Sequence, residues 1–178
     1  MPSIYTTAKA ITRHTMKVAI TGGTAGIGLA LARQFEAVGH EVIALSRRNG
    51  YNIRSIPKIA TAIEPCDMFI NNAQAGFAQT ELLFEIWRRW EGLNKTIVNI
   101  STQMTNMQLP PKREWDEYLV QKKALEVAEE LLTERNSRPR QILIKPGAIA
   151  TQPGQEPPLY KDVDEYAKEV FGWIQKNI

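Results

Sequence analysis

The stretch Thr21-Gly22-Gly23-Thr24-Ala25-Gly26-Ile27-Gly28 decides the fold of this chain. The short apolar run from Val18 to Ile20 precedes it, and apolar residues recur at helical spacing from Ile27 to Val38. This order of strand, glycine turn and helix predicts a backbone that approaches a pyrophosphate closely at a helix N-terminus. The chain contains no Gly-Lys-Ser/Thr sequence, which argues against a P-loop nucleotide hydrolase.

Strands and helices alternate along the rest of the chain. Buried strands are predicted at Glu41–Leu45, Asp67–Ile70, Thr96–Ile100 and Gln141–Ile144. Helices are predicted at Ile56–Ile63, Leu82–Trp90, Trp115–Arg135 and Val163–Ile174. Alternation of this kind is typical of the α/β class. We expect a Rossmann-type, doubly wound parallel sheet of six strands in a three-layer αβα arrangement.

Length and composition fit one domain. The 178 residues are 43% apolar, enough for one buried core and too few for two ordinary domains. We expect residues 16–178 to form the domain and residues 1–15 to be an N-terminal arm or extension. That segment holds Lys9 and Arg13 but no acid. It weakly resembles a transit peptide, and a surface arm is the alternative.

Charge and cysteine content exclude several partners. Lys and Arg total 22 against 19 Asp and Glu, and the resulting net charge of +3 is too small to indicate a nucleic-acid partner. No apolar stretch is long enough to span a membrane. Cys66 has no partner for a disulfide, which fits the cytoplasm. His14 and His40 have no neighbours at metal-ligand spacing, so we expect both to be solvated and no metal to bind.

The end of the second predicted strand lacks the acidic residue that would bind the ribose of NAD. Ser46-Arg47-Arg48 stands there instead. Guanidinium groups make charge-assisted and even bidentate hydrogen bonds with a 2′-phosphate, whereas a carboxylate would repel it. The residues therefore favour NADP(H) over NAD(H), and two solvated surface arginines are the alternative.

Four further motifs follow the glycine turn. They are Asn71-Asn72-Ala73 after a strand, Val98-Asn99-Ile100-Ser101-Thr102 along and after the next one, Tyr118-x-x-x-Lys122 on the long helix, and Pro146-Gly147-x-x-x-Thr151 after the last strand. In this order they resemble the short-chain dehydrogenase/reductase family in its single-domain form. The resemblance runs from about Lys17 to Ile174.

The resemblance implies a role for each motif. Tyr118 and Lys122 match the family's catalytic pair, and its catalytic hydroxyl falls on Thr102, with Ser101 as the alternative. Ile149 would contribute its backbone to the nicotinamide carboxamide, Thr151 its hydroxyl, and Asn52 would lie near the adenine. The full set of implied cofactor-binding residues is Thr21, Gly22, Thr24, Gly26, Ile27, Gly28, Ser46, Arg47, Arg48, Asn52, Asn72, Ala73, Tyr118, Lys122, Pro146, Gly147, Ile149 and Thr151.

The tyrosine and lysine suit carbonyl chemistry. Tyr118 and Lys122 stand at i and i+4, so they share one face of the predicted helix. A phenol can deliver a proton to a carbonyl oxygen, and a nearby ammonium lowers its pKa. Tyr5-x-x-x-Lys9 has the same spacing, but it precedes the glycine turn, so we expect it not to take part.

The chain departs from the family pattern by deletion. The segment between Ala73 and Asn99 is much shorter than is usual, and no residue matches the family's proton-relay asparagine, because Asn94 lies too close to the next strand. The substrate-covering segment shrinks to Gln152–Lys161, and we expect the usual seventh strand to be absent. We expect an open site that excludes water poorly.

Two functions of different classes remain open. The first is an NADP(H)-dependent oxidoreductase that interconverts a small carbonyl compound and an alcohol, with Tyr118 as acid/base. The second is a dinucleotide-binding sensor or interaction protein with little or no turnover, which the deletions favour. A sugar-nucleotide epimerase or dehydratase is a weaker third, because its usual glycine spacing needs a glycine where Ala25 stands.

Large apolar side chains on the predicted third helix offer two kinds of packing. Leu83, Phe84, Trp87 and Trp90 can pack against their own domain or against a second subunit. The resemblance implies a homodimer through the helices that contain Trp87 and Tyr118. The expected partners are thus a small-molecule substrate and a second copy, with no nucleic acid and no membrane.

Overall fold

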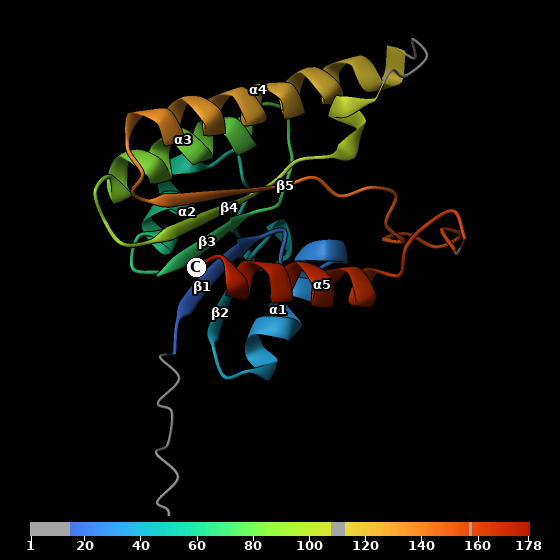
Figure 1. Ribbon diagram of the computed structural model, residues 1–178, viewed down its shortest axis with the longest axis horizontal. Helices are drawn as coiled ribbons and strands as arrows, with labels where there is room; N and C mark the ends of the chain where they lie inside the picture. Colours follow the sequence, from blue (N-terminus) through green and yellow to red (C-terminus); the bar gives the residue numbers. More distant parts are fainter. Residues whose placement is uncertain (1–14, 108–112, 157) are drawn as a thin grey trace, which may run out of the picture.

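The computed structural model describes residues 15–107, 113–156 and 158–178. Within them, parallel strands form one sheet in the order β2-β1-β3-β4-β5 (Figure 1). The strands are β1 (Lys17–Thr21), β2 (Glu41–Leu45), β3 (Met68–Asn71), β4 (Thr96–Ile100) and β5 (Arg140–Ile144). The Rossmann-type sheet is confirmed, but the expected count of six strands is wrong for the described residues, which form five.

The chain curls tightly directly after β2. After β2 the chain enters a short 3-10 turn, η1 (Arg47–Asn49), in which the Asn49 side chain accepts the backbone N–H of Ser46 at 2.8 Å. Gly50 then reverses the chain with a φ of 87°, a left-handed conformation that glycine adopts without strain. The next helix, α2 (Ile56–Ile63), then leads to β3, which pairs with β1, and β2 remains at the edge of the sheet.

Helices cover both faces of the sheet. On one face lie α1 (Gly26–Ala37) and α5 (Val163–Lys176), and on the other lie α2 (Ile56–Ile63), α3 (Ala78–Trp90) and α4 (Arg113–Arg135) (Figure 1). The three-layer αβα arrangement is therefore confirmed.

Successive strand residues point to opposite faces and divide the core in two. Val18 and Ile20 of β1 pack toward α1 and α5, whereas Ala19 packs toward α2 and α3. The same alternation in β3 and β4 places Asn71 and Asn99, the polar residues near their carboxyl ends, on the α3 side. A polar pair therefore enters a mostly apolar layer beside the functional edge.

The third helix begins a turn earlier than the sequence predicts. It starts at Ala78 instead of Leu82, and Ala78 and Gln79 are both buried. Trp87 and Trp90 lie in the core of their own domain, as does Leu83, so the proposal that they anchor a second subunit is wrong. Of that group only Phe84 is exposed.

The expectation that His40 is solvated is wrong, and Cys66 is a free, buried thiol. Half-buried His40 is not simply solvated, because its Nδ1 accepts the backbone N–H of Met16 at 3.2 Å and its ring packs on Phe35. Cys66 is fully buried, and burial raises the pKa of its thiol to about 11. His14 and the Tyr5-Lys9 pair lie outside the described residues.

The described part of the chain contains neither a membrane-spanning helix nor a cluster of metal-binding side chains. No helix there is long and apolar enough to cross a membrane. No group of His, Cys, Asp and Glu there is arranged to hold a metal ion.

The close approach of α1 to the glycine turn predicts an effect on stability. A methyl group at Gly28 would overlap the carbonyl oxygen of Gly22 and meet the Asn72 side chain at 2.7 Å. Gly28→Ala should therefore lower the free energy of unfolding by about 2 kcal/mol. Gly172→Ala on α5 meets nothing within 4 Å and should raise it by up to about 1 kcal/mol, through helix propensity. Urea unfolding measures both, and equal effects would contradict this packing.

Candidate active site

The candidate site lies at the carboxyl edge of the sheet, between two strands whose following helices lie on opposite faces. Neighbouring strands β1 and β3 send their following helices, α1 and α3, to opposite faces, which opens a crevice between the strand ends. Two cavities of about 370 and 260 Å³ follow this edge, and Gln74 lines both. They adjoin at Gln74, and we call the two cavities together the groove.

The larger cavity combines a free helix end with positive charge. It is lined by Thr24 and Ala25 at the start of α1, where no side chain caps the helix and no acid lies in the first turn. Its far wall holds Arg47, Arg48 and Arg54, and no acidic side chain of the described residues lines it. Uncapped N–H groups and guanidinium groups suit a ligand with phosphates at two points. The residues present fit a phosphorylated dinucleotide.

Thr21 fastens the two strand ends that flank the crevice. Its Oγ1 accepts the backbone N–H groups of Asn72 at 3.0 Å and Ala73 at 3.1 Å, and lies 3.4 Å from the carbonyl oxygen of Ile70. Asn72 returns a bond from its Nδ2 to the Thr21 carbonyl at 3.0 Å. Thr21 is almost fully buried, so its hydroxyl stabilises the two strand ends. It affects the shape of the groove indirectly, through the position of those ends.

The smaller cavity brings together the residues of three separate motifs. Tyr118 and Lys122 reach it from α4, Thr102 from the end of β4, and Ile149 and Thr151 from the loop after β5. The Thr102 hydroxyl is hydrogen-bonded to the Tyr118 phenol. The Lys122 Nζ lies 5.7 Å from the centre of the Tyr118 ring. The hydroxyl, phenol and ammonium groups therefore line one small space.

Burial acts on both ionisable groups of this pair. It raises the pKa of the half-buried Tyr118 phenol, and the hydrogen bond with Thr102 opposes part of that rise. Burial also lowers the pKa of the Lys122 ammonium to about 8, against the opposing charge of Glu126. Lys122 is only 3% exposed. A buried ammonium with a depressed pKa at a cleft is typical of a functional site.

Ser101 and Thr102 separate into different roles. The Ser101 hydroxyl donates to Glu126 Oε1 at 2.6 Å, which leaves it engaged with α4. Thr102 accepts the backbone N–H of Met104 at 3.3 Å, at the start of the short 3-10 helix η2 (Gln103–Asn106), and also meets Tyr118. Of the two candidate hydroxyls, Thr102 is the one beside the phenol.

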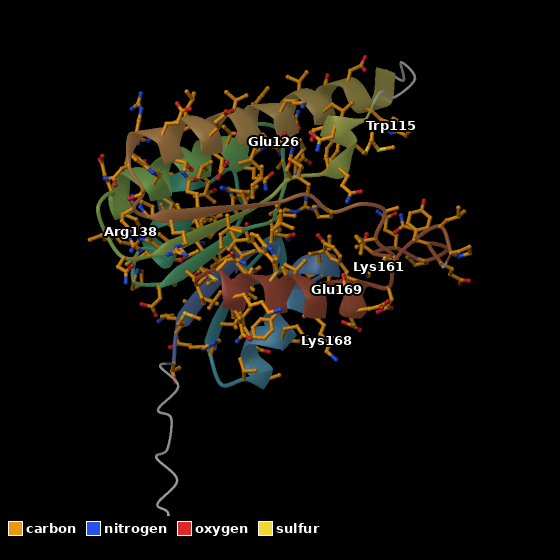
Figure 2. The ribbon with its side chains drawn as sticks, viewed as in Figure 1. Trp115, Glu126, Arg138, Lys161, Lys168 and Glu169 are labelled. Atoms are coloured by element: carbon orange, nitrogen blue, oxygen red, sulfur yellow. The ribbon has the colours of Figure 1, made fainter. Side chains whose placement is uncertain are left out.

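Glu126 joins the elements around the site. It lies on α4 (labelled in Figure 2) and accepts from Ser101, from Thr105 Oγ1 at 2.7 Å and from Lys145 Nζ at 2.8 Å. These partners come from the end of β4, from η2 and from the end of β5. Burial alone would raise the pKa of Glu126, but the hydrogen bonds from these three partners outweigh burial and hold it below its ordinary value.

The loop after β5 is folded back onto α5. Its residue Lys161 exchanges backbone hydrogen bonds with Ala148 and Ala150, each at 2.9 Å. The Lys161 side chain pairs with Glu169 of α5 at 2.6 Å, and both are labelled in Figure 2. These contacts hold the segment that carries Ile149 and Thr151 against the cavity.

Gln79 is a site residue that the sequence did not reveal. It lies in the first turn of α3, is 2% exposed, and its Oε1 accepts from Lys122 Nζ at 2.9 Å. A glutamine in a segment without clear apolar periodicity carries no local signal of burial.

Most residues expected to bind a cofactor line the groove. The larger cavity is lined by Thr21, Gly22, Thr24, Ser46, Arg47, Arg48, Asn52 and Ala73. The smaller one is lined by Ile27, Asn72, Ser101, Thr102, Tyr118, Lys122, Pro146, Gly147, Ile149 and Thr151. Gly26 and Gly28 line neither and instead allow the turn and the helix to approach their neighbours.

Several solved structures with a similar fold are described as short-chain dehydrogenases or alcohol dehydrogenases. One from Burkholderia cenocepacia, in complex with NADP, superimposes with a TM-score of 0.76 at 17% identity over 91% of this chain and 85% of that chain. An alcohol dehydrogenase from Thermococcus sibiricus, complexed with 5-hydroxy-NADP, gives a TM-score of 0.69 at 17% identity over 91% of each chain. A short-chain dehydrogenase from Sphingobium yanoikuyae, in complex with NADPH, gives 0.70 at 18% identity over 90% and 85%.

The chain has the fold of the short-chain dehydrogenases/reductases, so the resemblance in its motifs is confirmed for the fold. No protein-family model matches the sequence, and no curated protein is significantly similar to it. At this level of identity the likeness defines architecture, and the chemistry has to be argued from the residues in the groove.

The ion pair of Glu126 predicts a pH-dependent stability. A carboxyl group whose pKa is lower in the folded protein stabilises the fold above its unfolded pKa, and this stabilisation is lost as the pH falls through the folded value. Glu126→Gln should therefore lower the free energy of unfolding most at neutral pH and progressively less below the ordinary carboxyl pKa of 4.5.

Urea unfolding of both proteins between pH 7 and pH 3.5 tests this prediction. Glu130→Gln, a change at an exposed position of the same helix, is the matched control for loss of one negative charge on α4. A difference between wild type and Glu126→Gln that stays constant with pH would contradict the assigned ionisation.

Proposed function

We propose that this protein is an NADP(H)-dependent oxidoreductase of the short-chain dehydrogenase/reductase family that interconverts a small carbonyl compound and an alcohol. The observation that carries the proposal is the convergence of Thr102, Tyr118 and Lys122 on the cavity that continues the phosphate-binding groove. A groove that only bound a dinucleotide, as in a sensor, would not require a hydroxyl, a phenol and a buried ammonium at its end.

The residues of the cavity have complementary roles in this reaction. NADPH, when bound, supplies the hydride. The Tyr118 phenol donates the proton to the carbonyl oxygen, and the Thr102 hydroxyl orients that oxygen by a hydrogen bond. Lys122 stabilises negative charge on the phenol oxygen and would hold the nicotinamide ribose through its remaining N–H. Ile149 and Thr151 would hold the carboxamide.

The arginine-lined wall supports selection of NADP(H) over NAD(H). Arg47 and Arg48 are exposed at the groove, and neither is in an ion pair with a carboxylate of the described residues. Their guanidinium groups are therefore available to a 2′-phosphate, and this charge-assisted contact would be absent for NADH.

The outer surface of α4 supports assembly as a homodimer. Val120, Val127 and Leu131 are each more than half exposed on this helix, and Phe84 is exposed on α3, which packs against α4. Apolar side chains that remain on one face of paired helices are typical of an interface. We also propose a cytoplasmic location, which the single cysteine favours.

Replacing the phenol tests the proposed chemistry. Tyr118→Phe should lower kcat for reduction of an active carbonyl by roughly 10²- to 10⁴-fold, because the proton donor is lost, while the Kd for NADPH stays within about twofold. Tyr166→Phe on α5 makes the same change away from the groove and should leave turnover unaltered. Turnover by Tyr118→Phe at the wild-type rate would contradict the assignment, and no turnover by wild type with a broad carbonyl panel would favour the sensor.

Replacing an arginine tests cofactor selection. Arg47→Ala should weaken NADPH binding by roughly tenfold to a hundredfold and leave NADH binding unchanged, since only NADPH carries the 2′-phosphate. Isothermal titration calorimetry measures both. Arg33→Ala, an exposed change on α1 outside the groove, is the matched control. Equal loss for both nucleotides would contradict a contact with the 2′-phosphate.

A further inference from the structure

The side chain of Gln79 makes three buried hydrogen bonds at the inner wall of the site. Its Oε1 accepts from Lys122 Nζ at 2.9 Å. Its Nε2 donates to the carbonyl oxygens of Asn71 at 2.7 Å and of Ile100 at 3.0 Å. The Ile100 carbonyl also accepts from Lys122 Nζ, at 2.8 Å. The amide of Gln79 thus joins the ends of β3 and β4 to the lysine on α4.

These partners allow only one orientation of the amide. If it were turned over, Oε1 would face two carbonyl oxygens that cannot donate, and Nε2 would face an ammonium that cannot accept. The strand carbonyls therefore hold the Gln79 oxygen toward Lys122. Asn71 supports the helix from the other side, because its Nδ2 donates to the backbone carbonyl of Gln79 at 3.0 Å.

The surroundings make this oxygen important for Lys122. A buried ammonium needs acceptors to replace the water that it has lost. Two of its three N–H groups are taken by Gln79 and Ile100, which leaves one for the cavity that Lys122 lines. The ionisable groups near it are Tyr118 and Glu126 on its own helix, and Glu126 is already paired with Lys145. The groups that contact it from α3 and β4 are uncharged.

We propose that Gln79 is a positioning residue, which fixes the ammonium group of Lys122 beside Tyr118 and keeps it charged in its buried place. The inference rests on the proposed function, because it concerns the lysine assigned to that reaction. Gln79 acts on the reaction only through Lys122.

The direct test is the titration of Lys122 in the full chain without cofactor or substrate, followed by NMR of ¹³C-labelled lysine side chains. Gln79→Leu removes the acceptor, so the pKa of Lys122 should fall by about one pH unit. Gln79→Glu keeps an acceptor oxygen for Lys122 and adds a negative charge, while its second oxygen loses the two donor contacts of Nε2, so the pKa of Lys122 should rise. Gln175→Leu, the same chemical change at an exposed position of α5, should leave it unchanged.

The pH dependence of turnover is a second test, because the two variants should shift the profile in opposite directions. Reduction needs Lys122 charged, so the decline of kcat/KM at high pH should move to lower pH in Gln79→Leu and to higher pH in Gln79→Glu. A purely structural role would lower stability or rate at every pH without these opposite shifts. If Gln79→Leu does not fold, the upward shift in Gln79→Glu decides the matter.

The wild type alone provides a last check. Two hydrogen bonds should slow exchange of the Lys122 ammonium protons enough for NMR to detect them, and their absence would overturn the proposal without any variant. An unchanged Lys122 titration in both variants of an enzyme that turns over a carbonyl overturns this inference alone. Opposite shifts in a chain that binds neither NADPH nor NADH overturn the proposed function and leave the positioning role intact.

Discussion

The rest of the site depends on the fastening of β1 to β3 through the Thr21 hydroxyl. This oxygen accepts two backbone N–H groups of the segment that follows β3, and so it fixes where two neighbouring strands end. The glycine turn follows the end of β1, and the segment with Gln74 and Gln79 follows the end of β3. Each later feature of the groove is placed relative to this junction.

The second constraint is the cost of burying a positive charge among apolar residues. Lys122 lies in the layer between the sheet and α3, where Phe69 and Leu82 are fully buried. The ammonium is stabilised by the Ile100 carbonyl oxygen at the end of β4 and by the Gln79 side chain, and no carboxylate of the described residues is hydrogen-bonded to it. The lysine therefore keeps a depressed pKa and a free N–H toward the cavity. A direct carboxylate partner would have neutralised the charge that the phenol needs.

Much of the fold and part of the site could be predicted from local sequence. The glycine turn, the apolar strands and the order of the motifs predicted the parallel sheet, its layers and the residues that line the groove. The extent of α3 could not be predicted, because Ala78 to Glu81 show no apolar periodicity, and its first turn is buried through contacts with β3 and β4. The curl at Asn49 likewise depends on one side chain that returns to the backbone.

Long-range contacts decided what the motifs alone left open. The resemblance places the hydroxyl on Thr102 with Ser101 as the alternative, and in the structure Ser101 is engaged by Glu126, which is 25 residues away along the chain. Gln79 meets Lys122 across 43 residues of chain. A buried polar side chain is specified by partners that become neighbours only when the strands are in register, so a single sequence gives no periodic signal for it.

The most direct test of this account is a crystal structure of the wild-type protein with NADP⁺. The account predicts that the adenosine phosphate lies against Arg47 and Arg48, that the pyrophosphate meets the start of α1, and that the nicotinamide end reaches the cavity of Thr102, Tyr118 and Lys122. A dinucleotide bound outside this groove, or one whose nicotinamide end points away from Tyr118, would contradict the account.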